Sequence, residues 1–290
     1  MNKCFPYGLG TALITPFKAD GAVDFEALKR LLDIQLQGGV DYLVVLGTTG
    51  ETATLSEAEQ AAVREFIADY TRPSQIPLVL GLGGNNTAAV LAKIDALREE
   101  LVADYGAILS VCPYYNKPSQ EGLFRHFCAI AEASPIPVIL YNVPGRTGVN
   151  LLPETVMRIY NAHPDKVIAV KEASGNIEQI KHLIQLAQST GLHILSGDDG
   201  LTAAIMQAGG AGLISVLSNA YPEEASRLVH DADSALQEQL APLIGLLFKE
   251  GNPAGIKTVL TKKGVISNYL RLPLVPNSPA VQDEIAAIIA

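Results

Sequence analysis

The sequence predicts an α/β protein, a (β/α)8 TIM barrel with a small C-terminal helical domain. Short runs rich in Val, Ile and Leu recur along the chain, and a longer amphipathic stretch follows each of them. The runs are apolar at every position rather than at alternate ones, which is typical of parallel strands covered on both faces. A chain of 290 residues is long enough for such a barrel, typically about 250 residues, and an appendage.

Eight apolar runs are the predicted strands. They cover residues 9–14, 42–46, 78–82, 107–111, 138–141, 167–170, 193–195 and 212–216. Their spacing of roughly 25–35 residues leaves room for one helix after each strand, as a barrel requires. A doubly wound parallel sheet is the alternative, because periodicity alone does not separate the two folds.

The stretches between these runs carry helix signals. Asp24 can cap a helix that Gly38 stops, and Ser56 precedes Glu59 at the spacing of a capping box. Pro153 suits the first position of another helix. Further predicted helices cover residues 87–101, 120–132, 177–189 and 201–207.

Helical segments without strands follow the eighth unit, at about residues 234–249, 253–263 and 279–290. We therefore predict a catalytic barrel over residues 1–233 and a helical appendage over residues 234–290. No low-complexity linker separates them.

Composition and charge exclude several classes of protein. A hydrophobic fraction of 48% with 18% charged residues is incompatible with intrinsic disorder. The net charge of −9 disfavours nucleic acids and anionic membranes as partners, since both require clustered Lys and Arg. Pro6 and Gly8 interrupt the apolar N-terminal stretch, and polar residues interrupt residues 203–221, so neither a signal peptide nor a membrane span is expected.

The cysteine content indicates a compartment for the protein. The three cysteines, Cys4, Cys112 and Cys128, form an odd set that suits a reducing environment. We expect a cytoplasmic protein.

Lys171 is the most informative single residue, because it follows the apolar run 167–170 at the end of a predicted strand. Catalytic residues of such barrels lie at the carboxyl ends of the strands. Partial burial there favours the neutral amine, which can attack a carbonyl carbon. An ion pair with the neighbouring Glu172 is the alternative interpretation.

Tyr115, Tyr141 and Thr48 also follow predicted strands. A tyrosine hydroxyl both donates and accepts a hydrogen bond, so two tyrosines and a threonine at one barrel mouth can relay a proton. Aromatic packing is the commoner role of any single tyrosine, and it stays open for each of the two.

Two further features suit carboxylate binding. Thr48 and Thr49 lie in a turn between glycines, where backbone amides and hydroxyls can hold an anion, although a simple turn is the alternative. Arg146 follows the fifth strand and can bind a carboxylate through two nitrogens, although a surface arginine is equally plausible. The five histidines are scattered without metal-ligand spacing, so no metal site is predicted.

Six motifs in this order and spacing closely resemble the dihydrodipicolinate synthase family, which belongs to the pyruvate-dependent class I aldolases together with N-acetylneuraminate lyase. The motifs are GTTGE (47–51), PYYN (113–116), YNVPGRTG (141–148), VKEASGN (170–176), SGDD (196–199) and GLISV (212–216). The resemblance implies a barrel enzyme without a cofactor. By this resemblance the enzyme would condense pyruvate with L-aspartate 4-semialdehyde on the way to diaminopimelate and lysine.

The resemblance also implies catalytic roles. Lys171 would form a Schiff base with pyruvate, and Tyr141 would be the central proton donor and acceptor, linked through Thr48 to Tyr115. In this family the tyrosine that matches Tyr115 reaches into the active site of a neighbouring subunit. The resemblance also implies a homotetramer built from two tight dimers, although dimeric members of the family exist.

Four further residues match substrate-binding positions of the family. Thr49 would hold the pyruvate carboxylate, Gly197 and Ile214 would line the pyruvate pocket, and Arg146 would receive the semialdehyde carboxylate. Neuraminate and sugar-acid lyases usually lack this arginine and tend to read GSTGE in the first motif. A sister lyase that releases pyruvate from a sugar acid is the first alternative function, and a non-catalytic binding barrel is the second.

Lysine-inhibited members of the family bind lysine at the dimer interface through basic or histidine side chains and a glutamate. The matching positions here hold Glu57, Gln60 and Ala89. A glutamate cannot replace a histidine beside the incoming carboxylate of lysine, because the two carboxylates repel each other. Alanine cannot pair with the ammonium group of lysine. The sequence therefore predicts weak or absent feedback inhibition by lysine.

Overall fold

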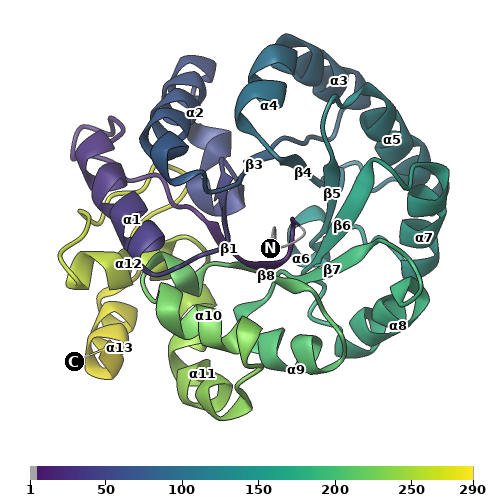
Figure 1. Cartoon of the computed structure of the whole chain (residues 1–290). Helices are drawn as coiled ribbons and strands as arrows, with labels where there is room; N and C mark the ends of the chain where they lie inside the picture. The colour runs from purple at the N-terminus through teal and green to yellow at the C-terminus, as the bar shows by residue number, and fades with distance from the viewer. Residues whose placement is uncertain (1–4, 290) are drawn as a thin grey trace. The chain divides into compact units, whose positions relative to one another are not determined.

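The computed structural model describes residues 5–289. Over these residues eight strands form a closed barrel in the order of the sequence (Figure 1). They are β1 (Gly8–Ala12), β2 (Tyr42–Val45), β3 (Leu78–Gly81), β4 (Ala107–Val111), β5 (Val138–Asn142), β6 (Val167–Glu172), β7 (His193–Ser196) and β8 (Gly212–Ser215). The predicted (β/α)8 barrel is confirmed, and the doubly wound sheet is wrong.

Helices follow the strands along the chain. They are α1 (Phe25–Gln37), α2 (Glu57–Thr71), α3 (Thr87–Ala96), α4 (Arg98–Asp104), α5 (Gln120–Ala133), α6 (Pro144–Thr147), α7 (Pro153–Ala162), α8 (Ile177–Ala187), α9 (Thr202–Gln207), α10 (Pro222–His230), α11 (Ser234–Phe248), α12 (Ala254–Lys262) and α13 (Pro279–Ile289). The chain forms two compact units. The first holds residues 77–214 with the segment up to Gly8, and the second holds residues 9–76 and 215–290.

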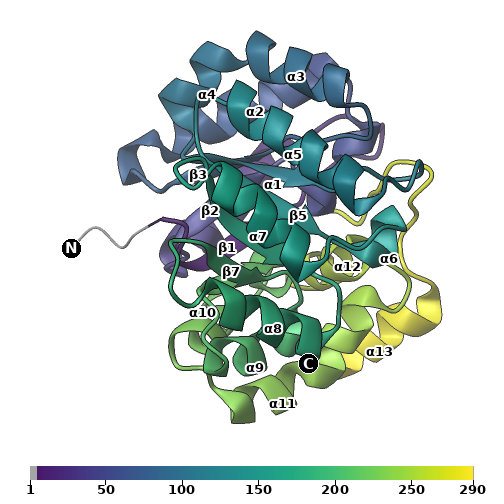
Figure 2. The ribbon, with the colours of Figure 1, turned by 90° about the vertical axis from the view of Figure 1, so that its right-hand side faces the viewer.

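The first unit contains a continuous run of parallel strands from β3 to β7. Register pairs Val111 of β4 with Tyr141 of β5, and Tyr141 in turn with Lys171 of β6. Both views show α3, α5, α7 and α8 following one another along the outer side of these strands (Figures 1 and 2). Nearly all side chains of these strands are buried, on both faces, which explains why apolar residues follow one another along them.

The second unit shows the predicted helix caps. The side chain of Asp24 accepts a hydrogen bond from the Ala27 amide at the start of α1, and the α1 C-cap is Gly38. Ser56 and Glu59 form the reciprocal capping box of α2. These caps satisfy backbone N–H groups that have no partner inside the helix.

Three elements differ from the prediction. The helix expected over residues 87–101 is two helices, because Leu97 leaves the helical conformation with φ −102° and ψ 9°. Strand β6 continues through Lys171 and Glu172, so both polar residues belong to the ladder rather than follow it. Helix α10 was not predicted, although Pro222 at its first position and the two acidic residues after it are typical starting signals.

Two further expectations concern the ends of the chain. Helix α11 begins at Ser234, but a separate helical domain over residues 234–290 stays a prediction. Cys4 lies outside the described residues. Within residues 5–289, no helix is long and apolar enough to cross a membrane.

Arg271 ties the C-terminal segment of the second unit to α2. Its guanidinium donates hydrogen bonds to both carboxylate oxygens of Glu59 and to the carbonyl oxygens of Gly21 and Thr54, and it lies 4.5 Å from the centroid of the Phe17 ring. The hydrogen bonds from Arg271 are the main reason that the pKa of Glu59 falls from 4.5 to about 2. A bidentate pair of this kind is stronger than a single surface contact.

We expect the Arg271–Glu59 pair to make the stability of the protein depend on pH in the acidic range. The folded-state pKa of Glu59 is depressed, so its contribution is complete above pH 4.5 and is lost as the pH falls toward about 2. Because the carboxylate is partly exposed, we expect the pair to contribute about 1 kcal/mol to the free energy of unfolding. Urea unfolding of the wild type and of Glu59→Gln at pH 7 and pH 3 measures it, with Glu284→Gln in an exposed pair as control. If the wild type and Glu59→Gln lose the same stability between pH 7 and pH 3, the prediction is contradicted.

Candidate active site

Lys171 and Tyr141 lie side by side on adjacent strands of the first unit. They are register partners on β6 and β5, and only 6% of Lys171 and 7% of Tyr141 is exposed. The Lys171 Nζ lies 4.3 Å from the centroid of the Tyr141 ring. An ammonium over an aromatic face is stabilised by the ring quadrupole, and the phenol stays next to the amine. The expected partial burial of Lys171 at a strand end is observed.

Glu172 has a different environment from that of Lys171, because successive side chains of a strand point to opposite faces. Its buried carboxylate accepts hydrogen bonds from Asn142 Nδ2 at 3.0 and 3.2 Å, from the Ser174 amide at 2.8 Å and from Gln179 Nε2 at 3.4 Å. Burial raises the pKa of Glu172, and these hydrogen bonds oppose the rise. The carboxylate is therefore held by amide donors, which does not support the alternative of a Lys171–Glu172 ion pair.

Glu172 and its donors Asn142, Ser174 and Gln179 form an amide cluster, which was missed in the sequence analysis. Asn142 and Glu172 directly follow Tyr141 and Lys171, and Asn142 also accepts a hydrogen bond from the Leu151 amide at 2.9 Å. Two polar residues at corresponding strand ends were the available signal. Their hydrogen bonds join the carboxyl ends of β5 and β6, which carry the tyrosine and the lysine.

Gly197 leaves the space that the Lys171 side chain occupies. A Cβ atom built on Gly197 would lie 3.0 Å from Lys171 Cε, 3.1 Å from Lys171 Cγ and 2.7 Å from Ala173 Cβ. Such contacts are too short for any other residue without a shift of its neighbours. Ile214, on β8 of the same unit, is buried.

Tyr115 and Arg146 are exposed in the same unit. Tyr115 is 90% exposed, and its φ of 75° lies in the left-handed region, which is unusual for an aromatic residue. The Tyr115 amide donates to the Thr147 carbonyl oxygen of α6, the short helix that carries Arg146. This hydrogen bond joins the Tyr115 segment to α6, and the proton relay through Tyr115 stays a prediction.

Thr48 and Thr49 belong to the second unit, in the 3₁₀ helix η1 (Thr48–Gly50) after β2. Thr48 is exposed and Thr49 is buried, and Asn252 Nδ2 donates a hydrogen bond to Thr49 Oγ1 at 2.9 Å. The binding of a carboxylate by this turn stays a prediction. The expected approach of Thr48 to Tyr141 stays a prediction, because the two residues belong to different units.

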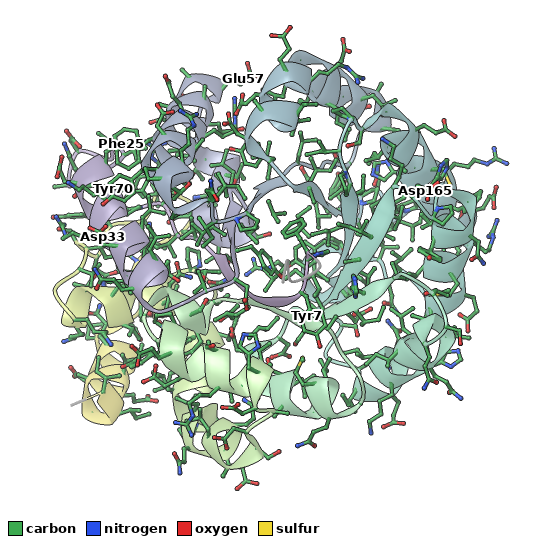
Figure 3. The ribbon with its side chains drawn as sticks, in the orientation of Figure 1. Tyr7, Phe25, Asp33, Glu57, Tyr70 and Asp165 are labelled. Carbon is green, nitrogen blue, oxygen red and sulfur yellow. The ribbon has the colours of Figure 1, made fainter. Side chains whose placement is uncertain are left out.

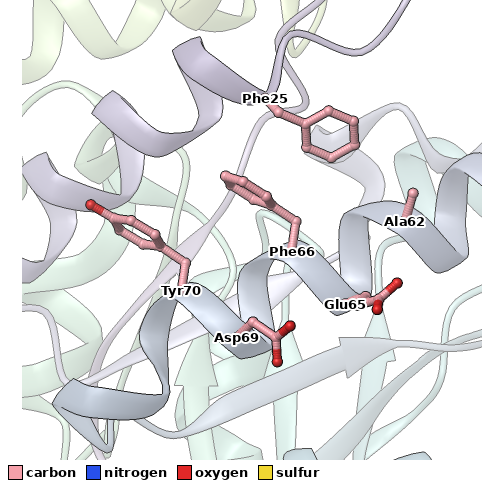
Figure 4. Close-up of a pocket in the computed structure, with 6 residues that line it drawn as sticks. All are labelled: Phe25, Ala62, Glu65, Phe66, Asp69 and Tyr70. Atoms are coloured by element: carbon pink, nitrogen blue, oxygen red, sulfur yellow. The ribbon is translucent and has the colours of Figure 1, made fainter.

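A groove of about 530 Å³ lies elsewhere, on α1 and α2 (Figure 4). Its aromatic side chains are Phe25, Phe66 and Tyr70, with 5.0 Å between the ring centroids of Phe25 and Phe66. Tyr70 donates a hydrogen bond to Asp33 on α1, and both residues are labelled in Figure 3. None of the predicted site residues lines this groove, and it is formed by helices rather than by strand ends. It is not the candidate active site.

No group of three His, Cys, Asp or Glu side chains is placed to hold a metal ion within residues 5–289. The candidate site instead offers an amine, a phenol and a glycine-lined space, with no ligand set typical of a metal.

Comparison with known proteins identifies the family. The model of the dihydrodipicolinate synthetase family matches residues 6–290. The chain belongs to this family. A 4-hydroxy-tetrahydrodipicolinate synthase of Parabacteroides distasonis is 50% identical over 289 residues, which cover 97% of this chain and 95% of the relative.

Solved structures of dihydrodipicolinate synthases have the same fold. A monomeric variant is 39% identical with a TM-score of 0.92, and the match covers 98% of this chain and 95% of that one. The chloride-inhibited enzyme of Acinetobacter baumannii, complexed with pyruvate, is 35% identical with a TM-score of 0.92, covering 98% of this chain and 97% of that one.

Proposed function

We propose that this protein is a 4-hydroxy-tetrahydrodipicolinate synthase, a lyase that condenses pyruvate with L-aspartate 4-semialdehyde in the diaminopimelate and lysine pathway. The observation that carries the proposal is the buried Lys171 amine against the Tyr141 phenol, at the strand ends of a chain in the dihydrodipicolinate synthetase family. Relatives named for this activity support the choice of substrates. The pyruvate complex of the Acinetobacter baumannii enzyme supports the keto acid.

The proposed reaction begins at the Lys171 nitrogen. The neutral amine attacks the C2 carbonyl of pyruvate, and loss of water from the carbinolamine leaves a protonated imine. Removal of a proton from the pyruvate methyl group gives an enamine, whose carbon attacks the aldehyde of the semialdehyde. The semialdehyde amine then attacks the imine carbon, closes the ring and releases Lys171. One water molecule is lost overall, and Lys171 is regenerated.

The neighbouring residues are assigned supporting roles in the same proposal. Tyr141 moves protons at the carbinolamine and enamine steps, and Thr48 connects it to Tyr115. Thr49 binds the pyruvate carboxylate, and Gly197 and Ile214 line the pyruvate pocket. Burial supports the chemistry, because it places the Lys171 nitrogen beside the Tyr141 ring and away from bulk water.

A coupled assay tests this function. Purified protein with pyruvate and L-aspartate 4-semialdehyde should form the cyclic product, and borohydride with labelled pyruvate should label Lys171. Release of pyruvate from N-acetylneuraminate or a 2-keto-3-deoxy sugar acid, without ring formation, would favour the sister lyase instead. Absence of both ring formation and labelling would favour a non-catalytic binding barrel.

Replacement of Arg146 separates the two substrates. We expect Arg146→Ala to raise the KM for the semialdehyde by roughly 10–100-fold, because a bidentate charged contact is lost. Borohydride trapping of pyruvate on Lys171 should stay at the wild-type level. Arg125→Ala on α5, an exposed arginine paired with Glu121, is the matched control. Equal loss of pyruvate trapping in Arg146→Ala would show that its assigned role is wrong.

The assembly is also a proposal. A homotetramer built from two tight dimers would bury the exposed Tyr115 against a neighbouring subunit, next to that subunit's active site. Analytical ultracentrifugation measures the oligomeric state directly, and a fully active monomer would contradict the role of Tyr115.

Weak or absent inhibition by lysine stays a prediction. Glu57 is exposed at the start of α2 (Figure 3), and the Gln60 amide already donates to the Thr52 and Leu55 carbonyl oxygens. A cytoplasmic location likewise stays a prediction.

A further inference from the structure

The turn that carries Thr48 and Thr49 contains a buried acidic residue in an unusual backbone conformation. Glu51 connects η1 to the 3₁₀ helix η2 (Thr52–Thr54), with φ 53° and ψ 34° in the left-handed region. Non-glycine residues adopt this region at an energetic cost. The Glu51 side chain is also fully buried. A strained backbone and a buried charge together require specific partners.

Lys257 of α12 supplies the main partner. Its fully buried ammonium donates hydrogen bonds to Glu51 Oε1 and to the Tyr269 carbonyl oxygen, and it lies 4.2 Å from the centroid of the Phe17 ring. The second Glu51 oxygen, Oε2, accepts a hydrogen bond from the Arg271 backbone amide at 3.1 Å. Both Glu51 oxygens are therefore held by the C-terminal part of the chain.

The neighbouring residues of the turn are held as well. Thr52 Oγ1 donates to the carbonyl oxygen of Gly47 at 3.0 Å, and Thr15 Oγ1 donates to that of Gly50 at 2.7 Å. Asn252, just before α12, donates to Thr49 Oγ1. One C-terminal segment thus contacts both Thr49 and Glu51, on either side of Gly50. Displacement of α12 would move the hydroxyl and backbone amides of the turn.

We propose that Glu51 and Lys257 are positioning residues that hold the Thr48–Thr49 turn in the conformation that binds the pyruvate carboxylate. This inference rests on the proposed function, because it gives a role to the turn only if the turn binds pyruvate. Both residues act through the turn, since neither buried side chain is available to a substrate. The ion pair gives the C-terminal helices a function in substrate binding, in addition to their contribution to packing.

Two variants test the proposal. Lys257→Met keeps the volume of the stem and removes the ammonium, so it leaves Glu51 without its charged partner. We expect the KM for pyruvate to rise by about 10-fold and the rate of borohydride trapping at low pyruvate to fall by a similar factor. The KM for the semialdehyde should change by less than about twofold, because its carboxylate is assigned to Arg146. Lys249→Met, in the exposed pair with Glu284 on the same C-terminal helices, should match the wild type.

Glu51→Gln keeps the test decisive if Lys257→Met does not fold. It retains the shape of the side chain and one acceptor oxygen, so we expect the same selective rise in the KM for pyruvate at about 3-fold. Circular dichroism confirms that the variants are folded at the assay temperature. A folded variant with an unchanged KM for pyruvate, or with equal changes for both substrates, would overturn the proposal. Failure of the wild type to trap pyruvate would instead overturn the proposed function.

Discussion

Lys171→Met is expected to abolish the condensation, with activity lower by roughly 10³-fold or more, because no other group replaces a lost covalent nucleophile. Borohydride should no longer attach labelled pyruvate to the protein. The structure makes this variant informative, because methionine fills the same buried space beside the Tyr141 ring. We expect thermal stability to be equal to that of the wild type or higher, since replacing a buried polar amine by an apolar side chain of similar size relieves its desolvation.

The matched control for this variant is Lys181→Met on α8. Lys181 is exposed and pairs with Glu178, so its loss should change neither activity nor labelling. Mass spectrometry of the borohydride-treated proteins locates the label. Labelled pyruvate on Lys171→Met, or activity within tenfold of the wild type, would mean that the nucleophile lies elsewhere.

Glu172→Ala is expected to cause a large loss of stability. It removes the acceptor shared by the buried Asn142 amide and the part-buried donors of Ser174 and Gln179, so each loses a hydrogen bond and a cavity forms beside β6. The lost hydrogen bonds and the lost packing together should lower the free energy of unfolding by about 3 kcal/mol. Because Glu172 follows Lys171 in the same strand, we also expect slower pyruvate trapping in the folded fraction.

Urea unfolding of Glu172→Ala, Glu172→Gln and the exposed-site control Glu178→Ala measures this effect. Glutamine keeps the volume and one acceptor but presents donors to the surrounding amides. The free energy of unfolding of Glu172→Gln should therefore lie between those of the wild type and Glu172→Ala. Glu178→Ala should unfold like the wild type. If Glu172→Ala loses no more stability than this control, the amide cluster does not contribute to the fold.

Local sequence signals predicted the elements well where the interactions are themselves local. The capping box of Ser56 and Glu59 spans three residues, and the apolar run at 107–111 coincides with β4. Both depend on neighbours in the chain, so the pattern contains the required information. The break at Leu97 was missed because it leaves no comparable signal in the pattern.

The candidate site was predicted only in part. The motifs identified Lys171, Tyr141 and Gly197, and the structure brings these three together in one unit. The amide cluster around Glu172 was missed because its members come from β5, β6 and α8, and each looks like an ordinary polar residue in the sequence. Their significance comes from burial, which makes every unpaired donor or charge costly.

The sequence alone determined the order of the strands, the caps of α1 and α2, and the place of the candidate nucleophile Lys171 near the end of β6, because periodicity and motif spacing are properties of the chain. Only the tertiary structure decided which buried charges are compensated and by what. Lys257 and Glu51 lie 206 residues apart, and no pattern in the chain relates them. Their pairing exists only because folding removes both groups from water, where each would otherwise have been solvated on its own.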